Sequence, residues 1–250
     1  MPNAANLIDA LASPPFDPER QYSLPWQAGL TGIGTNVEAA GREITTIEEL
    51  LTARDLRGRV TVLSDFTDTI PLIMLELGID PEDFSQAEYQ QALDKLATAL
   101  DVGQIRQITG NEYAPQLAKG DIAAAMAWSG DVIQLQFEDA DVAFNLPEKG
   151  GMLWSDNMQI PVLAEHKENA EKLMDFYYDP VVAAEVAAWV NYICPVKGAQ
   201  EAMADIDPEL ADNELIFPSE DTLAQVHEFK VMPWDEREDL LEQFNRVVGL

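Results

Sequence analysis

The sequence predicts an α/β protein. Segments with the composition of buried strands alternate along the chain with segments of helical periodicity, an order typical of α/β layers. The 250 residues fit one large domain or two modest lobes, and a hydrophobic fraction of 47% is enough to build a core. No internal repeat and no low-complexity linker interrupts the pattern.

The first half of the chain begins this alternation. Thr46 and Glu49 have the spacing of a capping box and predict a helix over about residues 47–55. Residues 59–63 have the character of a buried strand, and a helix over about residues 69–77 is expected after it. Apolar residues with helical spacing predict another helix around Leu93, Leu96, Ala97 and Leu100.

The second half continues in the same way. Strands are expected at residues 122–128 and 142–145, and helices near residues 166–178 and 180–190, with Pro180 suited to the first turn of the second helix. A last amphipathic helix is predicted from the apolar residues Leu240, Leu241, Phe244, Val247 and Val248.

The composition restricts the possible functions. A formal charge of −30, from 45 acidic and 15 basic side chains, argues against binding nucleic acid or anionic lipid. It is expected to attract cations. A solubility or salt-adapted surface is the favoured main cause of the charge, and both explanations can hold together. Cys194 is the only cysteine, so no intrachain disulfide is possible. The two histidines, His166 and His227, lack zinc-ligand spacing, and no metal or cofactor is expected.

Recognisable catalytic and targeting motifs are missing from the sequence. It contains no Walker loop, no GxSxG motif and no HExxH motif, so an enzyme is not expected. No apolar run reaches the length of a membrane span, and no signal peptide or lipid anchor is visible.

Aromatic and acidic residues are expected at strand ends and on one strand face. In GGMLWSDNMQIP, residues 150–161, Trp154 and Asp156 lie two positions apart, so a strand would place both side chains on one face. Aromatic faces with carboxylates nearby suit an alkyl-ammonium ligand, through cation–π contacts and charge-assisted hydrogen bonds. The candidate ligand-binding residues are Asp65, Asp68, Trp128, Trp154, Asp156 and Tyr192.

Each of these residues also has a simpler explanation. Asp68 is a plausible cap for a helix that begins at Thr69, whereas Asp65 is harder to explain as a cap. Trp128 and Trp154 are equally well explained as core residues. The two aspartates also fit a general acid and base, or ligands for a hard cation, but neither reading accounts for the tryptophans.

Four blocks of sequence resemble a known family. The blocks YSLPWQAGLTGIGTN, AMAWSGD, PEKGGMLWSDNMQIP and VNYICPV, in this order, resemble the spermidine/putrescine-binding proteins of bacterial ABC transporters. The resemblance implies a type II periplasmic binding protein fold, with two α/β lobes that close over a ligand. It assigns residues 1–30 and 154–200 to an incomplete lobe one, and residues 31–153 and 201–250 to lobe two. The chain is therefore expected to be truncated at its N-terminus.

The resemblance also implies roles for the aromatic residues. Trp128 corresponds to a tryptophan that stacks on the alkyl chain of the polyamine, and Trp154 corresponds to a second wall. Tyr192 corresponds to a tyrosine that hydrogen-bonds an amine. The implied partners are the polyamine and the permease subunits of an ABC transporter, in the periplasm or at the outer face of the membrane.

Carboxylates are implied to bind the ammonium groups. Asp65 and Asp156 correspond to aspartates with this role, and Asp68 stands where the family has a glutamate, one methylene longer. Lys230 stands near the position of an amide ligand. Either a cation there would repel the ligand or the register of the match is shifted by one residue, so Lys230 is left out of the predicted site.

Three other functions remain open at this stage. The first is a receptor for another cationic or polar solute, because a fold alone does not determine the ligand. The second is an enzyme that uses Asp65 and Asp68. The third is a truncated remnant or interaction domain that binds no solute.

Overall fold

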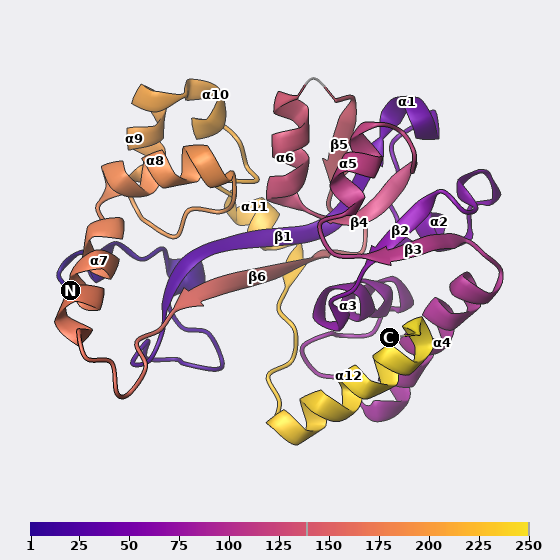
Figure 1. Cartoon of the computed structure of the whole chain (residues 1–250), viewed down its shortest axis with the longest axis horizontal. Helices are drawn as coiled ribbons and strands as arrows, with labels where there is room; N and C mark the ends of the chain where they lie inside the picture. The colour runs from indigo at the N-terminus through magenta and orange to yellow at the C-terminus, as the bar shows by residue number, and fades with distance from the viewer. Residues whose placement is uncertain (139, 250) are drawn as a thin grey trace. The chain divides into compact units, whose positions relative to one another are not determined.

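The computed structural model describes residues 1–138 and 140–249 of the chain (Figure 1). The chain forms two compact units. Unit 1 comprises Met1–Gly29 and Trp154–Ala224, and unit 2 comprises Leu30–Leu153 and Gln225–Leu250. The long strand β1 (Leu24–Asn36) and the strand β6 (Gly151–Met158) each contribute residues to both units.

Unit 2 is built on a mixed sheet. The strand order is β3-β2-β4-β1-β6-β7, and β5 also pairs with β1. β2 is parallel to both β3 and β4, whereas β1 is antiparallel to β4 and β5. Besides β1 and β6, the strands are β2 (Val60–Leu63), β3 (Ile105–Thr109), β4 (Ala124–Trp128), β5 (Val142–Asn145) and β7 (Val226–His227).

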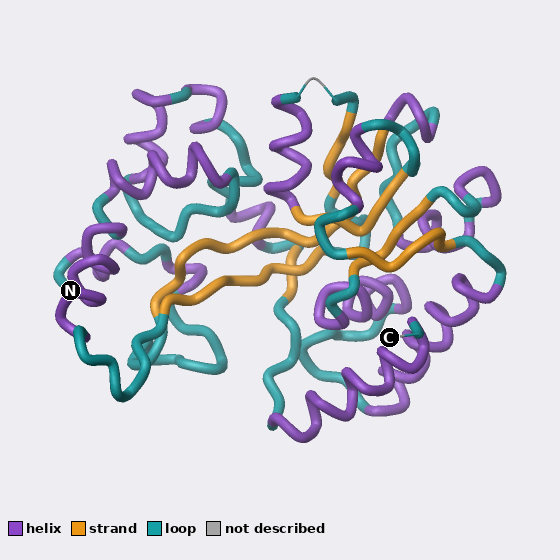
Figure 2. Tube along the Cα trace, viewed as in Figure 1, coloured by secondary structure: helices purple, strands orange, loops and turns teal. Residues whose placement is uncertain are grey.

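Helices cover the sheet of unit 2 on two sides. Helices α3, α4 and α12 lie on one side and α5 and α6 on the other (Figures 1 and 2). The helices are α1 (Val37–Ala40), α2 (Ile47–Thr52), α3 (Phe66–Leu77), α4 (Gln86–Asp101), α5 (Tyr113–Ala118), α6 (Ser129–Phe137) and α12 (Trp234–Val248). From the two predicted apolar faces, Leu93, Leu96, Leu240 and Phe244 are buried in the core of this unit, whereas Leu241 is exposed.

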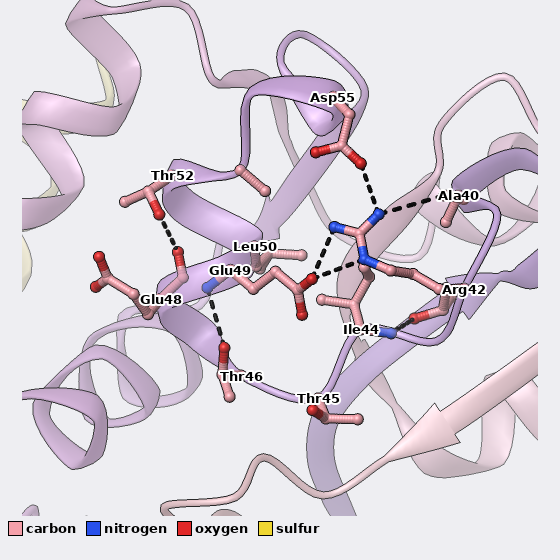
Figure 3. Close-up of polar contacts among 12 residues, drawn as sticks. Ala40, Arg42, Ile44, Thr45, Thr46, Glu48, Glu49, Leu50, Thr52 and Asp55 are labelled. Carbon is pink, nitrogen blue, oxygen red and sulfur yellow. Dashed lines mark hydrogen bonds and ion pairs between the residues drawn. The ribbon is translucent and has the colours of Figure 1, made fainter.

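The helix predicted over residues 47–55 is divided in the structure (Figure 3). The Thr46 hydroxyl caps α2 by accepting the Glu49 N–H. The chain becomes extended at Ala53, and a short 3-10 helix, η3 (Arg54–Leu56), follows. Arg42 forms ion pairs with Glu49 (2.7 Å) and Asp55 (2.6 Å), and thereby connects the two helical segments.

Helix α3 begins three residues earlier than predicted. Its N-cap is Asp65, whose Oδ1 accepts hydrogen bonds from the backbone N–H of Thr67 (2.9 Å) and from the Thr67 hydroxyl (2.7 Å). Asp68 therefore lies inside the first turn. The alternative that Asp68 caps a helix beginning at Thr69 is wrong, because Asp65 already occupies the capping position.

Unit 1 consists mainly of helices around the ends of β1 and β6. The Tyr178 hydroxyl donates to the Pro25 carbonyl (2.8 Å), and Ala28 of β1 pairs with Ile193. The helical segments are η1 (Asn3–Asn6), η2 (Asp9–Leu11), α7 (Lys167–Tyr177), α8 (Pro180–Val190), α9 (Ala199–Ile206), α10 (Pro208–Ala211) and α11 (Glu220–Leu223).

Residues 201–224 belong to unit 1, whereas the family resemblance assigns them to lobe two. Helix α9 packs on both α8 and α10. The Cys194 N–H donates to the carbonyl of Ile216 (3.1 Å), and the Ile216 side chain is fully buried. These contacts attach the segment to α8 and to the turn that follows it. Among the described residues, no helix is long and apolar enough to cross a membrane.

Candidate functional site

The candidate residues of unit 2 meet at one edge of the sheet. Strands β2 and β4 are parallel, so their carboxyl ends lie at the same edge. Asp65 and Asp68 follow β2, and Trp128 is the last residue of β4. Thr31 of β1 lies opposite Trp128 in the antiparallel register. The topology therefore brings together residues that are far apart in the sequence.

Asp68 is the centre of this group. Its side chain is buried, with an exposed fraction of 7% for the residue. The Thr31 hydroxyl donates to Asp68 Oδ1 (2.6 Å), and the Trp128 indole Nε1–H donates to Asp68 Oδ2 (3.0 Å). Both carboxylate oxygens thus accept a hydrogen bond from the protein, as a buried carboxylate requires.

The surroundings of Asp68 alter its acidity. Burial raises the pKa of Asp68 to about 6, because the charged form loses hydration, and the nearby Asp65 carboxylate also raises it. The hydrogen bonds from Thr31 and Trp128 favour the charged form and lower the pKa in part. Burial has the larger effect, so the pKa of Asp68 stays above its usual value.

Trp128 is also fixed through its backbone. Its N–H donates to the Tyr113 hydroxyl (2.9 Å), and the same hydroxyl donates to Asp131 Oδ2 (2.9 Å). Asp131 Oδ2 also accepts a hydrogen bond from the Asn111 side chain (2.9 Å). The rings of Tyr113 and Trp128 lie 6.2 Å apart. The position of Trp128 is therefore set by hydrogen bonds at both ends of the residue.

Asp65 has a different environment from Asp68. It is exposed at the N-terminus of α3, and its Oδ1 is the capping oxygen. An exposed carboxylate at this edge can bind a cation without the large desolvation cost that a buried one would incur. Of the two candidate aspartates in unit 2, Asp65 is the one open to solvent.

The candidate residues of unit 1 are carried by β6 and by the turn after α8. Because β6 is a strand, Trp154 and Asp156 project from the same face, as the sequence predicts. The Tyr192 ring lies 5.2 Å from the Trp154 ring at an angle of 64°. Tyr192 follows Asn191, which ends α8 in the left-handed conformation. Partial desolvation raises the pKa of Asp156 above its usual value.

The Trp154 indole lies against the backbone of β1. A Cβ atom on Gly29 would come within 2.3 Å of Trp154 Cζ2, so only glycine leaves room for the ring. The indole Nε1 is buried and has no hydrogen-bond partner among the described residues. Glycine in a strand often marks such a close approach. Unit 1 therefore holds an aromatic pair, with a carboxylate two residues along the same strand face.

The Lys230 ammonium group contacts three other groups within unit 2. Its Nζ donates to the Phe84 carbonyl (3.1 Å), lies over the Phe84 ring (5.1 Å to the centroid) and faces Glu236 (3.7 Å). These contacts are consistent with leaving Lys230 out of the predicted site.

Sequence reasoning did not find three residues that shape these groups. They are Thr31, which binds Asp68; Tyr113, which binds the Trp128 N–H; and Gly29, which makes room for Trp154. Their contacts are long-range, so no local pattern reveals them. The one available signal was the glycine content of the segment that contains Gly29.

Residues 1–218 match the family model described as bacterial extracellular solute-binding protein. The chain belongs to this family. The spermidine/putrescine-binding periplasmic protein of Escherichia coli is 26% identical over 221 residues, which are 88% of this chain and 62% of that protein. The chain thus spans less than two thirds of the length of this curated relative, and the relation is that of a distant homologue.

Solved structures agree with this assignment. A putative spermidine/putrescine ABC transporter from Listeria monocytogenes is 26% identical and has a TM-score of 0.88, covering 98% of this chain and 74% of that one. The substrate-binding protein PotD from Streptococcus pneumoniae, at 20% identity and a TM-score of 0.81, shows the same fold. The α/β periplasmic binding protein fold predicted from the sequence is confirmed. Because the family binds solutes and is not enzymatic, the enzyme alternative is set aside.

Proposed function

We propose that this protein binds a polyamine such as spermidine or putrescine and delivers it to an ABC transporter, in the periplasm or at the outer face of the membrane. The observation that carries the proposal is that each unit holds a tryptophan close to a carboxylate. In unit 2 these are Trp128 and Asp68, with the Asp65 carboxylate near Asp68. In unit 1 they are Trp154 and Asp156 on one face of β6. The homologues named for spermidine and putrescine binding support this choice of ligand.

The chemistry of these residues suits a chain of methylenes between ammonium groups. A tryptophan face binds a desolvated cation with about 0.5–2 kcal/mol, and the methylenes can lie on the same ring. A charge-assisted hydrogen bond to a carboxylate contributes about 1.5–3 kcal/mol. The net charge of −30 attracts a polycation over longer distances. In this proposal Asp65 and Asp156 bind ammonium groups, Trp128 and Trp154 contact the alkyl chain, and Tyr192 hydrogen-bonds an amine.

Calorimetric titration of the chain with spermidine and putrescine tests the proposal. We expect saturable binding that weakens about 2- to 30-fold in Trp154→Ala, from the loss of a cation–π contact. The expected weakening in Asp156→Ala is about 10- to 150-fold, from the loss of a charge-assisted hydrogen bond. Trp189→Ala and Asp205→Asn alter exposed residues of the same unit and serve as matched controls.

The remaining candidate functions predict other outcomes of the same titration. A receptor for another cationic or polar solute gives no heat with either polyamine but saturable heat with a different compound from a panel of amines, amino acids and sugars. A chain that binds no solute gives none with the whole panel. Equal affinity of the Trp154 and Asp156 variants and the unaltered chain would refute the assigned residues.

A further inference from the structure

We propose that Asp68 is a positioning residue, which orients and polarises the Trp128 indole and leaves direct contact with the ligand to Trp128 and Asp65. This inference rests on the proposed function, because it assigns a task within the same group of residues. It differs from the role that the family resemblance gives to this carboxylate, which is to bind an ammonium group directly.

The first support is that the carboxylate of Asp68 is already occupied. Oδ1 accepts the Thr31 hydroxyl at 2.6 Å and Oδ2 accepts the Trp128 Nε1–H at 3.0 Å. Only 7% of the residue surface is exposed. An ammonium group that reached Asp68 would have to lose its own hydration and compete with these two donors. Asp65, one helical turn earlier, is exposed, and its two donors from Thr67 both bind Oδ1.

The second support is that Trp128 is fixed in place. Its indole is held through Nε1 by Asp68, and its backbone N–H is held by the Tyr113 hydroxyl (2.9 Å). Thr31, the other partner of Asp68, lies opposite Trp128 in the register of β1 and β4. The carboxylate thus connects helix α3 to the tip of β4. A side chain held in this way loses little conformational entropy when a ligand binds.

The third support is electrostatic. The face of an indole attracts cations because of its quadrupole. A carboxylate that accepts the indole N–H shifts electron density toward the ring, since hydrogen bonds to charged groups polarise their donors. A cation on the ring therefore interacts with the Asp68 charge through the indole, without touching the carboxylate. Aspartate is one methylene shorter than the glutamate that the family has here, and it fits this position beside β1, where the Thr31 hydroxyl binds it at 2.6 Å.

Two other acidic groups lie near this arrangement. Asp65, at the N-cap of the same helix, acts on Asp68 through space. Asp131, from α6, is bound by Tyr113 and Asn111 on the backbone side of Trp128. Asp65→Asn and Asp131→Asn therefore serve as controls for the variant at Asp68.

The test of positioning needs no ligand. In the ¹⁵N-labelled full chain, Trp128→Phe identifies the Nε1–H resonance of Trp128. We expect this resonance to shift with pH around a midpoint near 6, the range in which Asp68 titrates. The shift should vanish in Asp68→Asn and persist in Asp65→Asn and Asp131→Asn. In Thr31→Val, which keeps the carboxylate and removes one donor, the midpoint should rise.

A second measurement separates positioning from direct contact. Spermidine affinity should fall as the pH is lowered through the midpoint of the Trp128 resonance, and Asp68→Asn should abolish that dependence while weakening binding less than Asp65→Asn. Trp234→Ala, at an exposed tryptophan of the same unit, is the control. A pH-independent Trp128 resonance, or a larger loss of affinity in Asp68→Asn than in Asp65→Asn, would overturn the inference. If no polyamine binds at all, the proposed function fails, and the resonance still decides whether Asp68 positions Trp128.

Discussion

Replacing Asp68 by asparagine should change how the stability of the protein depends on pH. The pKa of Asp68 rises from 3.8 to about 6 on folding, mainly because the carboxylate is buried. The folded chain therefore binds more protons than the unfolded chain between these values, so stability falls as the pH rises through this window and is level above it. At 1.36 kcal/mol for each pKa unit, the ionised carboxylate destabilises the fold by about 3 kcal/mol at neutral pH.

Urea unfolding of the unaltered chain and of Asp68→Asn at pH values from 4 to 7.5 measures this effect. Asparagine does not ionise, so the difference in unfolding free energy between the two proteins should shift by about 2–3 kcal/mol across this range, in favour of the variant at the higher pH. The other carboxylates are common to both proteins, so their contributions to the difference in unfolding free energy largely cancel. The asparagine amide places its N–H₂ group against one of the two donors, the Thr31 hydroxyl or the Trp128 Nε1–H, and this lowers the unfolding free energy of the variant by the same amount at every pH. A difference that stays flat from pH 4 to 7.5 would show that Asp68 is not the buried acid described here.

Predictions for three further positions follow from the local geometry. Gly29→Ala should destabilise unit 1 by about 1–3 kcal/mol in urea unfolding, because its Cβ would overlap the Trp154 ring, and this cost should largely disappear in a Trp154→Ala background. Asp65→Ser should keep the helix cap and the stability of the protein but lose polyamine affinity in calorimetry. Asp65→Ala should lose the affinity and also about 1 kcal/mol of stability. Equal affinity of Asp65→Ser and the unaltered chain would exclude Asp65 as a ligand contact. Arg42→Met should cost less than about 1 kcal/mol in urea unfolding, since its ion pairs with Glu49 and Asp55 are partly exposed, and a loss of several kcal/mol would contradict this.

The sequence predicted the alternation of strands and helices well, because the periodicity of apolar residues is a local property. Strand β5 has the predicted bounds, and α7 and α8 lie within a residue of theirs. The start of α3 was wrong because both Asp65 and Asp68 are acceptable caps in sequence. The structure distinguishes them because Asp68 is buried, with its carboxylate bound by Thr31 of β1 and Trp128 of β4.

Strand β1 was the main omission in the fold. Its sequence, LPWQAGLTGIGTN, contains a proline and three glycines, which are rare in strands, so its local composition predicts no strand. The structure explains two of the glycines by close neighbours. Gly29 lies under the Trp154 ring, and a Cβ on Gly32 would come within 2.6 Å of the Asn145 carbonyl oxygen. Such neighbours come from distant parts of the chain, so local propensity does not reveal them.

The residue types of the candidate site could be predicted from the sequence, but the role of each residue could not. The W-x-D spacing places Trp154 and Asp156 on one face by strand geometry alone. The roles of Asp65 and Asp68 depend on which one is buried, and on Thr31 and Trp128 as hydrogen-bond donors. A sequence gives no sign that a threonine on β1 and an indole on β4 converge on the same carboxylate.

The most direct test of polyamine binding is an isotope-filtered nuclear Overhauser experiment on the full chain with ¹³C-labelled spermidine. The account predicts contacts between the spermidine methylene protons and the ring protons of Trp128 and Trp154, and none to the exposed rings of Trp189 and Trp234. Contacts absent from both Trp128 and Trp154 at a saturating spermidine concentration would contradict it.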